Sequence, residues 1–477
     1  GGFEAFRRES SGLLINCIIP SFVVAGAASL LQKPIMGDFI KNKAGLSWCW
    51  ANGDSLSKIE KFYKESKGAT KEERVFNTLK NTFDNISGVA GDIDNGGEKI
   101  FKDVLANDDE YINTLKSWAK NLVAEKPDKK LNKTFYETIV SKTGVSENIK
   151  FNGDKGYFSN NLKSLCDSLS DVLHNVNKID LDDAHISDYF SKARKLVNWK
   201  SAAGLGVIIP LAIAAQPINR WITHKLSGKK GAPIYNDDKE RVLTPDEKRK
   251  LTAQKFFAVP LMAGVAGLSM WMDRPSLKMF QFKNIFPTMD QARIISAATF
   301  SSRIAAAEDS NELKENTIRD IATFSSFYFL GDYAAKAIAT YLDKHHEGSQ
   351  LLTHLKNSDK NDNVFKKLWN WAKHTSIKST DEIMAIKDEA LRNKNKKLRT
   401  ICQLGNIAFS LLSLGIFIPV YTRTQVNKKE REKLEALKNA QTQNNGAPAQ
   451  TESTDTAPAA TQARFQKTPP FQAFFNS

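Results

Sequence analysis

The chain has 477 residues, a formal net charge of +15 and a mean hydropathy of -0.40. That hydropathy is low for a chain embedded in a membrane throughout, so a large part of it must be soluble in character. The 4 cysteines exclude a disulfide-rich scaffold. Nucleic-acid binding would explain the net positive charge, but much of the excess of Lys and Arg lies next to apolar runs. Membrane topology accounts for that placement, so we expect no nucleic-acid partner.

The first apolar run covers residues 12–31 and follows Arg7 and Arg8. A helix of this length crosses about 30 Å of hydrocarbon. We therefore interpret residues 1–32 as a cytoplasmic N-terminus followed by a first membrane span. A cleaved signal peptide is the alternative, although the run does not end in a small-residue cleavage site.

Residues 33–200 are polar, but apolar residues recur three and four positions apart, as in Leu115, Trp118, Ala119 and Leu122. Such stripes must pack against partners, so we expect a soluble, all-helical domain with its own core. Its two cysteines, Cys49 and Cys166, are predicted to form a disulfide if the domain faces an oxidising compartment. Two separate buried thiols are the alternative.

Two uncharged apolar runs, 201–218 and 256–272, enclose a loop rich in Lys and Arg. The pattern predicts a membrane hairpin over residues 201–272, with its loop in the cytoplasm because positive charge beside a span resists translocation. By parity, the domain of residues 33–200 lies on the other side of the membrane.

Residues 273–400 form a mixed helical region. Residues 294–307 are apolar but adjoin or contain Arg293 and Arg303, which favours a surface-lying or re-entrant helix over a span. Residues 321–341 are long enough to cross the membrane and contain Asp332 and Lys336. These two residues are four apart and are predicted to pair on one helix face. Either they mark an ion or substrate path, or they neutralise each other, or the segment stays outside the bilayer.

Residues 401–421 are predicted to be the last span, with basic residues on both sides, so charge does not orient it. Residues 422–477 should form a basic helix and then a disordered tail with an aromatic end, which we expect in the cytoplasm. The predicted fold is an all-α, polytopic helical membrane protein of about four to six spans, with an inserted soluble helical domain.

Sequence signatures of nucleotide-binding loops, hydrolases and zinc proteases are absent, so no catalytic, cofactor or metal site is expected. Asp92 to Asp103 weakly resembles a calcium loop, and His345, His346 and His354 lie near acidic residues. We interpret these as a glycine-rich turn and a solvated loop.

We expect a non-enzymatic membrane scaffold or interaction protein. Its partners would be the bilayer, and other proteins bound through the outer domain or the tail. A transporter or channel is the alternative, because Pro20, Pro210, Pro260 and Pro419 interrupt the apolar runs. Small residues such as Ala263 and Gly267 favour close helix packing, either within the chain or in a homo-oligomer.

Overall fold

The computed structural model describes most of the chain up to residue 424. The described residues are 14, 18–41, 44, 53–92, 96–154, 156–157, 161–179, 183–227, 243–272, 280–282, 287–356, 362–413, 416, 420–421 and 424. Contacts divide the chain into one unit of residues 1–420 and a second of 421–477. Almost all of the second unit, including the predicted tail, lies outside the described residues.

The described part is mostly helical, with a few short strands. In its first half the elements are α2 (Ile19–Met36), α3 (Asp38–Lys41), α4 (Gly53–Glu65), α5 (Lys71–Asp84), β1 (Ile86–Val89), β2 (Glu98–Ile100), α6 (Phe101–Leu105), α7 (Asp109–Val123), α8 (Lys129–Thr143), β3 (Ile149–Phe151), α9 (Leu162–Val176) and α10 (Asp183–Ser227). The second half contains α11 (Pro245–Met272), α12 (Met289–Ala305), α13 (Ser310–Ser325), the π-helix η4 (Ser326–Leu330), α14 (Gly331–His345), β4 (Leu352–His354), α15 (Val364–His374), β5 (Thr375–Ile377), α16 (Thr380–Met384) and α17 (Glu389–Leu412).

Helices α4 to α9 and the first part of α10 surround one apolar core, as the three-and-four spacing predicted. The ring of Trp118 stacks on Phe135 with centroids 4.2 Å apart, and Phe83 packs edge-on against Phe135 at 5.1 Å. Polar caps define where the helices begin: Asp108 accepts a hydrogen bond from the third residue of its helix, and Asn161 does the same.

The expectation of an all-helical domain is wrong in one detail, because the domain contains a three-stranded antiparallel sheet in the order β2-β1-β3. The central strand is fully buried, and a Cβ on Gly88 would lie 2.8 Å from the carbonyl oxygen of Asn148. Only glycine therefore allows β1 and the chain before β3 to approach so closely. Strands of three or four residues are too short to show an alternating pattern.

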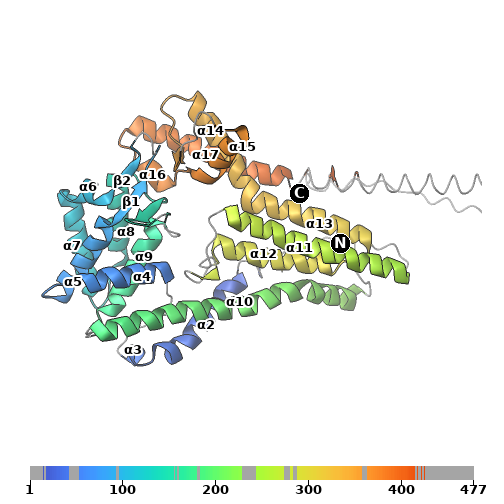
Figure 1. The fold of residues 1–477 in the computed structure, drawn as a ribbon, viewed down its shortest axis with the longest axis horizontal. Coiled ribbons are helices and arrows are strands. Elements are labelled where there is room, and N and C mark those ends of the chain that lie inside the picture. Colours follow the sequence, from blue (N-terminus) through green and yellow to red (C-terminus); the bar gives the residue numbers. More distant parts are fainter. Residues whose placement is uncertain are drawn as a thin grey trace, which may run out of the picture. The chain divides into compact units, whose positions relative to one another are not determined.

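Helix α10 is a single helix of 45 residues that crosses the boundary predicted near residue 200 (Figure 1). Its first part contributes Tyr189, Phe190 and Val197 to the core of the soluble domain. Its second part contributes Ile208 and Ala212 to a separate apolar cluster with α2 and α12. One continuous helix therefore belongs to both cores.

Three described helices are long and apolar enough to span a membrane: Ile19–Met36, Ala184–Leu226 and Pro245–Trp271. They overlap the three apolar runs predicted to form the first span and the two arms of the hairpin. The total of four to six spans is not confirmed, and the predicted span at 401–421 lies partly outside the described residues.

Helix α12 packs between α10 and α11, and α13 packs on α11 and α12 (Figure 1). Residues 294–307 lie almost entirely in α12, where Ile295 and Ile304 are fully buried within the protein. The surface-lying or re-entrant position of this segment in a membrane stays a prediction. The described chain then continues through α13, η4 and α14 without a break in helical structure, and α14 packs on α17. At the contact of α14 with α17, the end of the Ile338 side chain occupies the space that a Cβ on Gly405 would need.

Strands β4 and β5 form a small antiparallel sheet beside α14. This part of the chain contacts the soluble domain: Tyr136 donates a 2.8 Å hydrogen bond to Asp381, and Glu382 accepts one of 2.9 Å from the backbone N–H of Ser146. His354 also donates its backbone N–H to Gly91 at 3.0 Å. The soluble domain is thus held by α10 and by contacts with the region after α14.

The carboxylate of Glu60 on α4 links that helix to α10. It lies 2.5 Å from Arg194 and 2.6 Å from Lys64. Burial alone would raise the pKa of Glu60, but the hydrogen bonds and charges of Lys64 and Arg194 outweigh burial and hold the pKa below its ordinary value of 4.5. The ionised form is therefore the one that stabilises the fold.

We predict that Glu60→Gln lowers the free energy of unfolding by about 2 kcal/mol at neutral pH, because a charge-assisted contact with Arg194 is lost. The decrease in the free energy of unfolding has its full size above pH 4.5. It disappears as the pH falls through the lowered pKa of Glu60, because the carboxylate of the unchanged protein then becomes protonated. Denaturant unfolding of the full chain in detergent, followed by circular dichroism between neutral and acidic pH, measures this. Glu65→Gln is the control, since Glu65 lies in an exposed pair with Lys61 at 4.0 Å. Equal destabilisation by the two variants would contradict the prediction.

Candidate functional site

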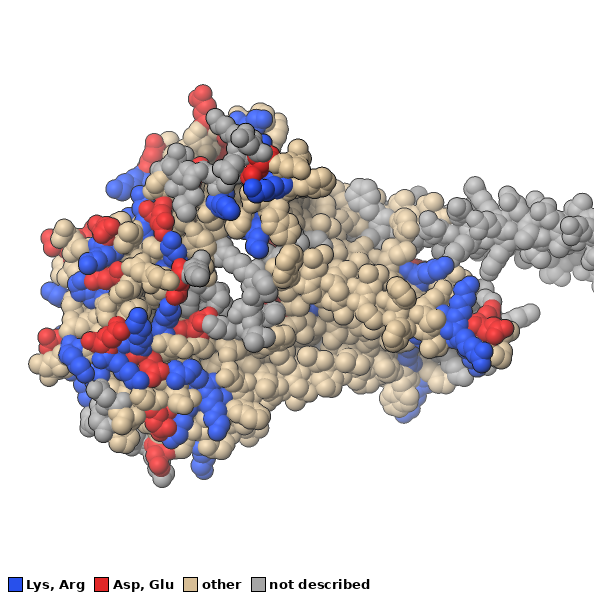
Figure 2. Space-filling view, viewed as in Figure 1, with Lys and Arg blue, Asp and Glu red and all other residues tan. Residues whose placement is uncertain are grey.

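The outward faces of α2, α10 and α11 are apolar. Their exposed large side chains include Phe22, Leu30, Val207, Ile213, Trp221, Phe256, Phe257, Leu261 and Leu268. Figure 2 shows the surface over α10 to α13 with few charged side chains, while Lys and Arg gather at one end of it. An exposed apolar surface on long helices is typical of a segment that faces lipid.

The inward faces of α12 and α13 carry polar side chains among the apolar ones. In α12, Gln291, Ser296, Thr299 and Ser302 are buried, and in α13 the buried polar residues are Glu312, Asn316 and Asp320. The three residues of α13 are four apart and form a stripe on one side of the helix. A helical bundle surrounded by lipid needs its polar side chains inside and its apolar side chains outside. Within hydrocarbon, a polar group can find a hydrogen-bond partner only in the protein itself.

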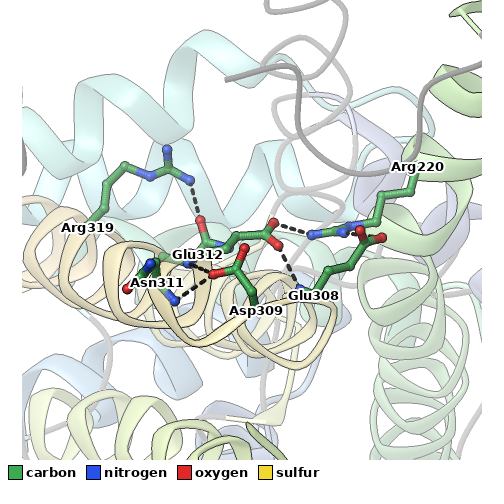
Figure 3. A network of polar contacts seen from close by, with 7 residues as sticks. Arg220, Glu308, Asp309, Asn311, Glu312 and Arg319 are labelled. Carbon is green, nitrogen blue, oxygen red and sulfur yellow. Dashed lines mark hydrogen bonds and ion pairs between the residues drawn. The ribbon is translucent and has the colours of Figure 1, made fainter. Parts of the chain in front are cut away.

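Arg220 of α10 reaches the N-terminal end of α13 (Figure 3). Its guanidinium lies 2.5 Å from the buried carboxylate of Glu312 and 3.0 Å from Glu308. The second oxygen of Glu312 accepts a 2.7 Å hydrogen bond from the backbone N–H of Glu308. Asp309 caps α13 by accepting from the backbone N–H groups of Asn311 and Glu312. Negative side chains at this helix end are favourable because the exposed N–H groups carry partial positive charge.

A second ion pair joins α12 to α13. Arg303 lies 3.0 Å from Asp320, whose side chain is only 1% exposed, and Arg319 lies 3.6 Å from the same oxygen. The other oxygen of Asp320 makes no hydrogen bond within the described part of the chain. Arg319 also donates to Asn316 at 3.0 Å. Asp320 is thus held through one oxygen by two guanidinium groups.

Arg293 connects α12 to the π-helix. Its guanidinium donates to the backbone carbonyl of Tyr328 at 2.7 Å and lies 3.1 Å from Asp290. The hydroxyl of Tyr328 is 2.6 Å from that of Ser296. The carbonyl to which Arg293 donates therefore lies within the π-helical turn of η4. The charges that suggested a surface helix therefore bind other helices.

The structure places the predicted pair of Asp332 and Lys336 in the first turns of α14. Lys336 donates a 3.1 Å hydrogen bond to the backbone carbonyl of Ala372 in α15, and its ammonium lies 5.3 Å from the ring centroid of Tyr333. Lys336 thus binds the C-terminal end of α15. Its pairing with Asp332 stays a prediction.

The predicted disulfide also stays a prediction. Cys166 is buried in α9, and burial raises the pKa of its thiol, while Cys49 lies outside the described residues.

In the turn after β1, Gly96 has a φ of 74° and Gly97 donates its N–H to the backbone carbonyl of Asp92. His345 bonds the carbonyl of Tyr341 at 2.8 Å. Within the described ranges, no group of three His, Cys, Asp or Glu side chains is placed to bind a metal ion.

Sequence reasoning missed Arg220, Glu312 and Asp320. The signal was present, since Glu312, Asn316 and Asp320 repeat every four residues. A polar stripe of this kind normally indicates a solvated face. Only the packing of α12 and α13 against α10 and α11 shows that the stripe faces inward.

Comparison of the chain with known protein families, with curated proteins and with solved structures gives no match. The site must therefore be interpreted from its own chemistry. Arginine stays protonated at all accessible pH values, so Arg220 and Arg303 keep the positive charge that faces the buried carboxylates.

We predict that Arg303→Met destabilises the protein by about 3 kcal/mol, because it leaves the buried carboxylate of Asp320 without its main partner. The double variant Arg303→Met with Asp320→Leu should be more stable than the single one, since no buried charge remains. Denaturation of the full chain in mixed micelles measures both. Lys133→Met is the control, because Lys133 lies in an exposed pair with Glu137 and should change little. A double variant less stable than the single variant would contradict this account.

Proposed function

We propose that the protein is a membrane-anchored, non-enzymatic scaffold. Helices α2 and α10 to α13 anchor it in the bilayer, and the domain of residues 33–200 meets protein partners on the non-cytoplasmic side. The observation that carries the proposal is α10, a helix of 45 residues with one part in each core. At 1.5 Å per residue it is about 68 Å long. A domain built around such a helix keeps a fixed orientation relative to the membrane.

The buried ion pairs support the same proposal. Arg220 with Glu312 ties α10 to α13, and Arg303 with Asp320 ties α12 to α13. Alternating access in transporters requires helices to rock against each other around a central site. Breaking a buried pair costs about 3–5 kcal/mol, so two such pairs oppose rocking.

A transporter or channel is the second candidate function. Pro210, Pro217 and Pro260 lie inside α10 and α11, and the π-helix adjoins the polar interior. The second oxygen of Asp320, buried and without a hydrogen bond in the described residues, is the atom that a transported cation would meet.

Two spin labels distinguish the candidates. They are placed at Lys61→Cys on α4 and Lys225→Cys near the end of α10, in a chain whose Cys17 and Cys49 are replaced by serine. The scaffold predicts one narrow distance distribution in liposomes, centred at about 45–50 Å, since some 30 residues of α10 separate the two sites. A flexible glycine linker inserted after Trp199 should broaden it, which is the matched control.

The same liposomes are tested for proton and potassium flux. A scaffold gives no flux above protein-free vesicles. Flux, or two distance populations whose ratio changes with an ion gradient, would contradict the scaffold and support the transporter.

A further inference from the structure

Helix α15 is apolar on one face, and that face is exposed. Val364, Phe365, Leu368 and Trp369 follow helical spacing and are 76%, 82%, 57% and 40% exposed. Only Asn370 is buried in this helix of 11 residues. Exposure of four adjacent large apolar side chains in water is unfavourable, and contiguous apolar patches of this kind mark interaction surfaces.

Lysines lie behind the apolar face of α15 and at its edge. Lys366 pairs with Asp362 at 2.6 Å, and Lys367 is exposed. Lys373 lies 5.7 Å from the ring centroid of Trp369. A short amphipathic helix with aromatic and aliphatic residues on one face and Lys on the other is the form of helix that lies in a membrane interface.

Trp369 connects this face to the membrane anchor. Its ring centroid lies 5.7 Å from that of Trp271, and Lys373 is the same distance from Trp271. Trp271 is at the end of α11 opposite the basic residues Lys248, Arg249 and Lys250. Tryptophans gather where spans leave the hydrocarbon, so the pair marks the level of the headgroups.

Contacts with α14 hold α15 in this orientation. Trp371 donates its indole N–H to Thr340 at 2.9 Å, and its ring lies 6.1 Å from that of Tyr333. Lys336 donates to the carbonyl of Ala372 near the helix end. These contacts hold α15 against α14 and leave Phe365 and Leu368 of the apolar face exposed, while Trp369 of the same face packs against Trp271.

We propose that α15 is an interfacial helix that binds the non-cytoplasmic leaflet, with Phe365 and Leu368 inserted among the headgroups and the first acyl carbons. This inference rests on the proposed membrane anchoring. The partner is a lipid surface and not a protein groove, because the face continues the apolar surface of α11 through Trp271 and Trp369. The lysine ammonium groups then lie at the level of the lipid phosphates.

The test uses the full chain in phosphatidylcholine liposomes, with an environment-sensitive fluorophore on Phe365→Cys and with Cys17 and Cys49 replaced by serine. Lipids that carry a doxyl group near the headgroup should quench the fluorophore about twofold more than lipids with the group in the middle of the acyl chain, because an interfacial helix is shallow. The change Leu368→Glu in the labelled chain should reduce quenching, since it places a charge in the apolar face.

Two further label positions separate this inference from the anchoring on which it rests. Leu261→Cys, on the exposed face of α11, should be quenched most by the deep doxyl group, and Lys61→Cys should not be quenched. If Leu261 is quenched but Phe365 is not, α15 does not bind lipid and the inference is wrong. Blue-shifted emission at Phe365 without quenching would also overturn it, since a second copy or another protein would then cover the face. Absence of quenching at Leu261 would instead overturn the membrane anchoring.

Discussion

The exposed apolar faces of α10 and α11, together with the charged side chains buried on α12 and α13, constrain the rest of this structure. Phe256 and Phe257 are 80% and 82% exposed on α11, and in water each would forgo about 1.5–3 kcal/mol of burial. In hydrocarbon the same side chains cost nothing, whereas Glu312 and Asp320 cannot face lipid. We therefore propose that the bilayer, and not water, is the solvent for which these helices are built.

Because the carboxylates of Glu312 and Asp320 point inward, their ion pairs constrain how the helices pack. Asp320 holds α13 to α12 through Arg303, and Glu312 holds α13 to α10 through Arg220. Because α10 also contributes to the core of the soluble domain, the position of that domain follows from the packing of the anchor. Contacts such as the hydrogen bond of Tyr136 with Asp381 attach the domain at a second place.

The helices of residues 53–200 and the long apolar helices α10 and α11 could be predicted because each depends on local patterns: apolar spacing, caps and uncharged runs. The sheet around Gly88 could not, since its strands are too short to show a period. The inward direction of Asp320, and the contact of Lys336 with α15, depend on packing between segments distant in sequence. Helical periodicity places a residue on a face but does not say what covers that face.

The most direct test is to determine on which side of the membrane each segment lies. The account places Gly153, in the turn after β3, outside the cytoplasm, and the loop that contains Gly231 inside it. Cysteines introduced at these two positions, one at a time in a chain without Cys17 and Cys49, are treated with a thiol reagent that does not cross membranes. In oriented vesicles the account predicts labelling from opposite sides. Labelling of both positions from the same side would contradict the membrane hairpin and the anchor built on it.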